Sequence, residues 1–97
     1  MAQYIVLTRV SPEAVKKPEG LLDLEKKVKD RVAAECPQVK WTANYAVMGP
    51  YDYFDLFEAP DNETAMRVST IIRSEGNAST ELWPATEWSK FRDQVLK

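Results

Sequence analysis

The chain combines stretches in which apolar and polar residues alternate with stretches in which apolar residues recur every three or four positions. The alternating stretches are rich in residues that favour strands. They predict four strands, over residues 4–10, 39–48, 51–59 and 78–85. Gly49-Pro50 separates the second strand from the third, so these two are predicted to form an antiparallel hairpin.

Helical spacing predicts three helices between and after these strands. In the first helix, over residues 21–35, the apolar stripe consists of Leu21, Leu24, Val28 and Val32. In the second helix the stripe consists of Ala65, Val68 and Ile72, with Asp61 as the predicted N-cap and Gly76 as the predicted C-terminal cap. In a last helix Thr86 is the predicted cap, and the shared face carries Trp88, Phe91 and Val95.

The resulting order, β-α-β-β-α-β with an added C-terminal helix, is the ferredoxin-like pattern of an α+β protein. It predicts a four-stranded antiparallel sheet with both main helices on one face. The length of 97 residues fits one domain, residues 1–97.

Alternation along the strands predicts what each face of this sheet carries. We assign the purely aliphatic sets, such as Ile5 with Leu7, to the helix side, together with the odd positions of the second strand. The uncovered face is then expected to carry Tyr4, Val6, Thr8, Thr42, Asn44, Tyr53, Asp55 and Phe57. A slip or bulge of one residue would exchange part of this set between the faces.

The uncovered face predicted in this way is too aromatic for a solvated surface and too polar for an ordinary core. Small proteins rarely leave a large apolar patch open. We therefore expect a second copy to pack against it, sheet to sheet, and to close a barrel around a shared cavity. Such a cavity, lined by polar groups among aromatic rings, is typical of a pocket for a small organic ligand.

Asp55 is the strongest candidate for a ligand-binding residue, because a carboxylate on a middle strand needs a partner or a ligand. The candidate partners are the Tyr4 hydroxyl, the Asn44 amide and Arg9. A hydrogen bond across the subunit interface and a role in a pocket both remain open. Tyr51 and Asp52 are either a second polar pair in the pocket or parts of the hairpin turn. The candidate ligand-binding residues are Tyr4, Asn44, Tyr51, Asp52, Tyr53, Asp55 and Phe57.

Composition narrows the classes of function. The chain has no histidine, which excludes histidine-dependent triads and imidazole metal sites, and one cysteine, Cys36, which cannot form an internal disulfide. No metal site and no cofactor are expected. The net charge is −2, and the basic residues at 26–31 alternate with acidic ones, as on a solvated helix face, so we expect no nucleic-acid partner. No run is long enough to span a membrane, and the N-terminus lacks a basic start, which predicts a cytoplasmic location.

Four short motifs in order resemble the GYD-domain family, small prokaryotic proteins of dimeric α/β-barrel type. They are Tyr4-Ile5-Val6-Leu7, Gly49-Pro50-Tyr51-Asp52, Glu58-Ala59-Pro60-Asp61, and Gly76 to Glu81. The pattern is also similar to the ligand-sensing domain of leucine-responsive and asparagine-type regulators. That resemblance implies sensing of a small molecule at subunit interfaces, whereas the helix-turn-helix of those regulators has no counterpart in this chain.

Three functions follow as hypotheses. The first is a homodimeric module that binds or senses a small molecule. The second is a cofactor-free enzyme, similar to small monooxygenases or isomerases, in which Asp55, Tyr53 and Asn44 polarise an enolizable substrate. The third, RNA binding, ranks last because Asp52, Asp55 and Glu58 stand where RNA-recognition modules carry basic residues. The lack of any known catalytic constellation leaves enzyme activity undecided.

Overall fold

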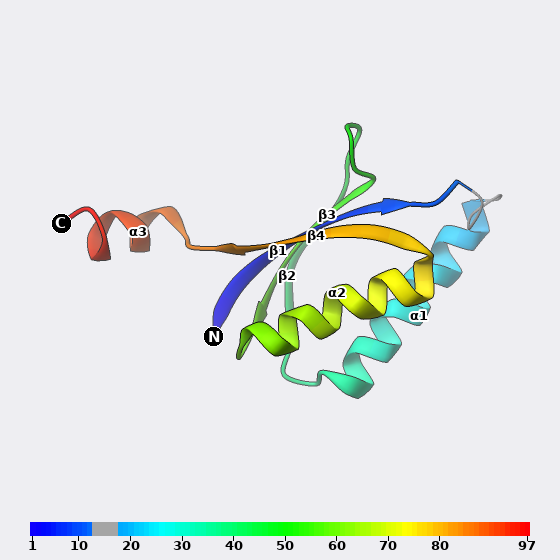
Figure 1. Cartoon of the computed structure of the whole chain (residues 1–97), viewed down its shortest axis with the longest axis horizontal. Coiled ribbons are helices and arrows are strands. Elements are labelled where there is room, and N and C mark those ends of the chain that lie inside the picture. Colours follow the sequence, from blue (N-terminus) through cyan, green and yellow to red (C-terminus); the bar gives the residue numbers. More distant parts are fainter. Residues whose placement is uncertain (13–17) are drawn as a thin grey trace.

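The computed structural model describes residues 1–12 and 18–97 (Figure 1). Within them the elements are β1 (Ala2–Val10), α1 (Pro18–Glu35), β2 (Lys40–Ala46), β3 (Tyr53–Ala59), α2 (Asn62–Gly76), β4 (Ala78–Ala85) and α3 (Trp88–Gln94). The strands pair antiparallel in the order β2-β3-β1-β4. Helices α1 and α2 lie side by side against one face of the sheet, while the other face is bare (Figure 1). The predicted ferredoxin-like fold is confirmed.

The core lies between the sheet and the two helices, and aromatic rings form the part contributed by the sheet. Phe57 on β3 is 0% exposed and stacks on Tyr4 of β1 with ring centroids 5.7 Å apart. Above these rings α2 contributes the buried Ala65, Val68 and Ile71. The Tyr4 hydroxyl donates to Asn62 Oδ1, 2.5 Å away, at the start of α2. The polar end of the ring is therefore satisfied where the helix begins.

The predicted assignment of the two sheet faces was wrong. Strand register places Tyr4 opposite Phe57, Val6 opposite Asp55 and Thr8 opposite Tyr53, all on the helix side. Ile5, Leu7 and Leu56 alternate with them and point to the bare face. Aliphatic character did not identify the covered face, because α2 offers small side chains such as Ala65 and Ser69 and leaves room for aromatic rings beneath it.

A bulge in β2 explains why this strand contributes to both faces. The pairing with β3 shifts between Trp41, which is opposite Phe57, and Ala43, which is opposite Leu56. Thr42 is the extra residue and is exposed. Trp41 accordingly packs on the core, whereas Ala43 and every second residue after it face the bare side. The predicted odd-numbered helix-facing set holds only up to the bulge.

Two of the three predicted helix caps were wrong. Asp61 caps α2 as predicted, with its side chain accepting from the Thr64 N–H. The C-cap of α2 is Asn77, which takes the left-handed conformation at φ 46°, rather than Gly76. Gly76 instead permits the close approach of Leu24, since an added Cβ would lie 3.4 Å from that side chain. Glu87, not Thr86, caps α3 by accepting from the backbone of residues 89 and 90.

Helix α3 stands apart from the rest of the molecule. It continues β4 beyond the edge of the body and lies away from α1 and α2 (Figure 1). No other helix or strand among the described residues packs against it. The radius of gyration is accordingly 14.3 Å, against about 12.5 Å for a compact chain of this length. We refer to residues 86–97 as the C-terminal arm.

Candidate functional site

A cavity of about 400 Å³ lies on the helix side of the sheet, beneath residues 21–29 of α1. Its apolar wall consists of Val10, Leu21, Leu24, Val28, Ile72 and Ala78. Its polar wall is formed by β1, β2 and β3 together with one side of α1, and contains Thr8, Glu25, Lys29, Asn44, Tyr53 and Asp55. The volume and this division into an apolar and a polar side are typical of small-molecule sites.

Three side chains from three elements form a hydrogen-bonded chain at the polar wall. Lys29 Nζ on α1 donates to Asn44 Oδ1 on β2, 3.2 Å away. Asn44 Nδ2 in turn donates to Asp55 Oδ1 on β3 at 2.6 Å. The Lys29 ammonium also sits 3.7 Å from the centre of the Trp41 ring, a cation–π contact. The amide thus links an ammonium to a carboxylate and fixes the position of both.

Burial shifts the proton affinities of these groups. Loss of water around the carboxylate raises the pKa of Asp55, although the Asn44 hydrogen bond and the Lys29 charge oppose this. Loss of water likewise lowers the pKa of Lys29, against the nearby charges of Asp55 and Glu25. Burial, followed by the neighbouring carboxylates, raises the pKa of the Tyr53 hydroxyl. Shifted titratable groups that converge on a cavity are characteristic of binding and active sites.

Thr8 adds an unpaired polar group to the same wall. Its side chain is 4% exposed, and its Oγ1 has no hydrogen-bond partner among the described residues. Buried hydroxyls are normally hydrogen-bonded, because an unpaired one costs about 1–3 kcal/mol. Thr8 is one of the residues that line the cavity, but its Oγ1 exposes less than 1 Å². The hydroxyl is therefore closed off from the cavity in this structure.

The structure separates the predicted site residues into three groups. Asn44, Tyr53 and Asp55 line the cavity together. Tyr4 and Phe57 lie in the core beneath α2 and do not line it. Of the candidate partners for Asp55, the structure selects Asn44, since the Tyr4 hydroxyl donates to Asn62.

Tyr51 and Asp52 belong to a structural tie between the hairpin loop and the strands beside it. Asp52 Oδ2 accepts from the Val10 N–H at 2.8 Å, and the Asp52 N–H donates to the Thr8 carbonyl at 2.8 Å. The Tyr51 hydroxyl donates to Glu81 Oε2 on β4. Asp52 therefore connects the loop to the end of β1 by hydrogen bonds, and Tyr51 contacts β4, the edge strand on the other side of β1.

Sequence reasoning missed Lys29 and Glu25, because both belong to a helix segment that reads as solvated. Lys29 is in fact half-buried, with its stem beside the apolar stripe and its ammonium over Trp41. The available signal was position: Lys29 directly follows Val28 and lies at the border of the stripe. A lysine at such a border can bury its aliphatic stem and turn its ammonium toward polar groups on the sheet.

Two further surveys concern metals and membranes. Over residues 1–12 and 18–97, no three metal-ligating side chains of the His, Cys, Asp and Glu types gather in one place. In the same residues, none of the helices has the length and apolar character required to cross a bilayer.

The fold and the cavity define a small ferredoxin-like domain with a partly polar cavity between its helices and its sheet. The GYD domain family matches the chain over residues 4–95, and the chain belongs to this family. A relative from Thermus thermophilus is 30% identical over 84 residues, which covers 82% of this chain and 83% of the relative. That relative is named as a glutamine synthetase and cystathionine beta-lyase binding protein.

Solved structures of low sequence identity share the fold. The leucine response regulatory protein of Mycobacterium tuberculosis superposes with a TM-score of 0.62 at 16% identity, covering 89% of this chain and 51% of that one. This chain thus spans about half the length of the regulator. The de novo designed protein Foldit4 superposes with a TM-score of 0.55 at 20% identity, covering 88% and 98% of the two chains. At such identities the likeness concerns the fold alone.

Proposed function

We propose that this protein binds a small organic molecule in the cavity beneath α1. The observation that carries the proposal is the convergence of the hydrogen-bonded Lys29–Asn44–Asp55 chain on one apolar-walled cavity. Burial also raises the pKa of Asp55 and lowers that of Lys29, as is common where charged groups face a binding site.

The chemistry of the walls describes the ligand. Asp55 accepts hydrogen bonds, so a donor such as an amine, amide or hydroxyl fits beside it. The side chains of Leu24, Val28 and Ile72 suit an apolar body of a few carbon atoms. The supported ligand is a compact molecule with a polar head and an apolar body.

Ligand-induced thermal stabilisation tests this proposal. We expect a library of small amines, amides and hydroxylated acids to contain compounds that raise Tm of the wild-type chain. The stabilisation should disappear in Asp55→Asn, because it removes the carboxylate that accepts from the ligand. Leu56→Ala, on the other face of β3, is the matched control and should respond like the wild type. Binding that persists unchanged in Asp55→Asn would contradict the proposal.

We further infer that the module is a homodimer through the bare sheet face. The predicted polar pocket between the subunits is not part of this proposal, because its residues lie on the helix side. What supports a dimer is the row of apolar side chains left on that face, among them Leu56 and Trp83, the latter 47% exposed. Light scattering over a dilution series measures the assembly.

A second candidate function is binding of a protein partner. The observation that favours it is the name of the Thermus thermophilus relative, which describes a protein that binds two enzymes. The exposed hairpin tip, where Val47 is 39% exposed and Met48 is fully exposed, offers an apolar contact. Size-exclusion chromatography of this protein with purified glutamine synthetase and cystathionine beta-lyase from Thermus thermophilus tests this function. Co-elution that Met48→Ser abolishes would support this function, and separate elution would contradict it.

A further inference from the structure

The C-terminal arm carries a helix that no other element among the described residues packs against. Helix α3 has seven residues and no packing partner among the described elements. Isolated helices shorter than about 12–15 residues are marginal in water. Trp88, Phe91 and Val95 nevertheless share one side of it and are 62%, 36% and 62% exposed. The arm therefore presents an apolar stripe that this chain leaves uncovered.

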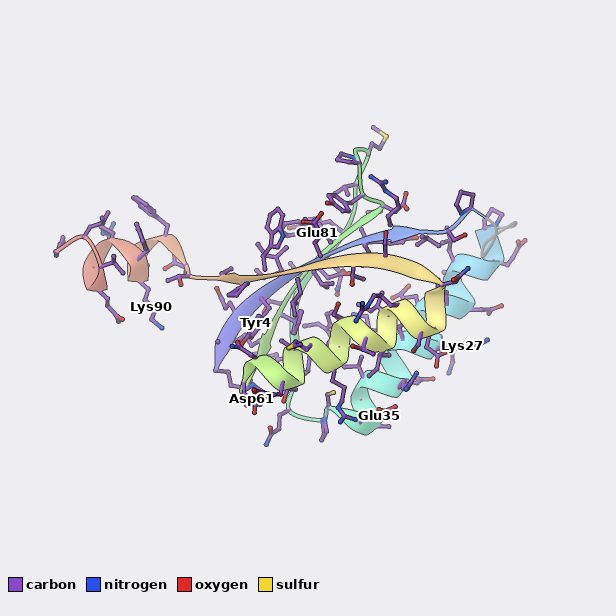
Figure 2. The ribbon with its side chains drawn as sticks, in the orientation of Figure 1. Tyr4, Lys27, Glu35, Asp61, Glu81 and Lys90 are labelled. Atoms are coloured by element: carbon purple, nitrogen blue, oxygen red, sulfur yellow. The ribbon has the colours of Figure 1, made fainter. Side chains whose placement is uncertain are left out.

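The stripe faces the same side as the bare face of the sheet. Lys90 points from α3 toward the side on which α1 and α2 lie, whereas Glu81 points from β4 to the opposite side (Figure 2). Helical geometry places Trp88 about 200° around the axis from Lys90. The apolar stripe is thus turned to the side of Glu81. It extends the bare face beyond the end of β4.

The bare face itself is suited to burial. Its centre is formed by Ile5, Leu56 and Trp83, which are neighbours across β1, β3 and β4. Two charged groups of this face are engaged within the chain. Glu81 accepts from the Tyr51 hydroxyl and from Trp83 Nε1, 3.2 Å away, and the Arg9 guanidinium donates to the Pro50 carbonyl. Glu58 and Lys40, opposite each other on β3 and β2, lie on the same face and carry opposite charges. Covering the face is therefore favourable where these two groups stay at its edge.

We propose that in the homodimer each C-terminal arm crosses to the partner and lays its Trp88–Phe91–Val95 stripe on the partner's bare sheet face. The proposal rests on the dimer inferred above and adds the arm to it. A second copy is the fitting occupant because one chain carries both the projecting stripe and the bare face, and a two-fold axis covers both at once. Glu81 and Arg9 have opposite charges, so two such faces do not repel each other through net charge.

The area supports this arrangement. Four strands of about eight residues give a flat face of roughly 500 Å² in projection. A stable interface buries about 800 Å² of accessible surface per partner. Side chains make the accessible surface of a face larger than its projection, so the sheet face supplies much of such an interface and the arms enlarge it. Each exchanged arm adds contacts in both directions, because every protomer gives one arm and receives one.

Light scattering with three full-length variants tests the arm. The arm variant is Trp88→Glu with Phe91→Glu, the face variant is Leu56→Glu, and the control is Lys90→Glu on the polar side of α3. We expect the wild type and the control to dimerise equally. The dimer dissociation constant of the arm variant should be at least about thirtyfold higher than that of the wild type, as expected when central aromatic residues of an interface are lost.

Mixing the arm variant with the face variant gives the more specific result. In the mixed dimer, the intact arm of the face variant meets the intact face of the arm variant, so one of the two arm contacts is restored. The mixture should therefore associate more tightly than the face variant alone, in which neither arm meets an intact face. Circular dichroism of each variant confirms that it is folded.

The outcomes separate the two proposals. If the face variant dissociates while the arm variant dimerises like the wild type, the sheet-face dimer stands and the arm exchange is wrong. If the wild type is monomeric at tens of micromolar, the dimer and the arm exchange are both wrong. The apolar stripe would then be a contact surface for a different protein. Neither result affects the ligand proposal, which has its own readout in thermal stabilisation.

Discussion

The two faces of one sheet differ more in what covers them than in how apolar they are. The covered face carries Tyr4 and Phe57, stacked under α2, and beside them a cavity with polar groups. The bare face carries Ile5, Leu56 and Trp83, neighbours without a helix above them. Composition alone therefore does not tell which face is inside.

The difference shows how the fold divides its tasks. On the helix side, the core beneath α2 is closely packed, while the space beneath residues 21–29 of α1 remains open and partly polar. On the bare side Glu81 is paired within the chain, with Tyr51 and Trp83. The covered face is thus equipped for a small ligand and the bare face for a second sheet. Four substitutions test this division, in order from the largest expected effect to the smallest.

Phe57→Ala should lower the free energy of unfolding by about 3–5 kcal/mol, because it removes a fully buried ring from the middle of the core. The matched control is Leu56→Ala, one residue away on the opposite face. At low micromolar concentration, where a weak dimer is dissociated, the control should cost about 1 kcal/mol or less. Urea unfolding measures both. Equal losses at the two positions would mean that the covered face is not the core of the protomer.

Asp52→Ala should lower the free energy of unfolding by about 1–2 kcal/mol, since the Val10 N–H loses its carboxylate partner. This bond holds the hairpin loop to the end of β1 and belongs to neither face. Asp23→Ala, on the exposed side of α1, is the control and should change stability by less than about 0.5 kcal/mol. Ligand-induced stabilisation should survive in both. A loss of ligand response in Asp52→Ala alone would place the site nearer the hairpin than the cavity indicates.

Thr8→Val should raise the free energy of unfolding by about 1 kcal/mol, because an unpaired buried hydroxyl is replaced by a methyl group of similar size. Thr42→Val, at the exposed bulge of β2, is the control and should leave stability nearly unchanged. Urea unfolding without ligand gives the comparison. A loss of stability in Thr8→Val would show that the hydroxyl already has a partner in the free protein.

Asp55→Asn should raise the free energy of unfolding at pH 7 by less than about 1 kcal/mol. The folded-state pKa of Asp55 is raised by burial, so its ionised form is disfavoured by folding. The cost is fully present above the folded pKa and vanishes as the pH falls below the unfolded pKa. The difference between variant and wild type should therefore shrink on acidification. A difference that grows at lower pH would show that Lys29 and Asn44 outweigh burial.

Much of the fold was predictable from local patterns. The strands, the helices and their order followed from alternation and helical spacing, and Asp61 was identified as a cap by its position before the apolar stripe of α2. The termini of the elements were less accurate: β2 ends at Ala46 and β3 begins at Tyr53. The loop between them is therefore longer than Gly49-Pro50. Within it the Val47 N–H donates to the Asp52 carbonyl, and the Asp52 N–H donates to the Thr8 carbonyl.

The candidate site was predictable only in part. Asp55 stood out because a carboxylate on a middle strand requires a partner, and Asn44 was among the partners considered. Lys29 was not predicted, because its role depends on how α1 lies over Trp41, and no local pattern encodes that position. Tyr4 and Phe57 were predicted to contact the ligand because strand alternation places them on the same face as Asp55. In the structure both side chains are buried in the core.

The sequence by itself determined the elements, their order and which residues of β1 and β3 share a face, since these depend on the periods of strand and helix. Only the tertiary structure decided which face the helices cover, where β2 changes faces, and that α3 stands away from the body. The physical reason is that both faces are apolar enough to be buried. The choice between them depends on the fit of Ala65 and Val68 to the rings beneath α2, a property of packing between distant segments.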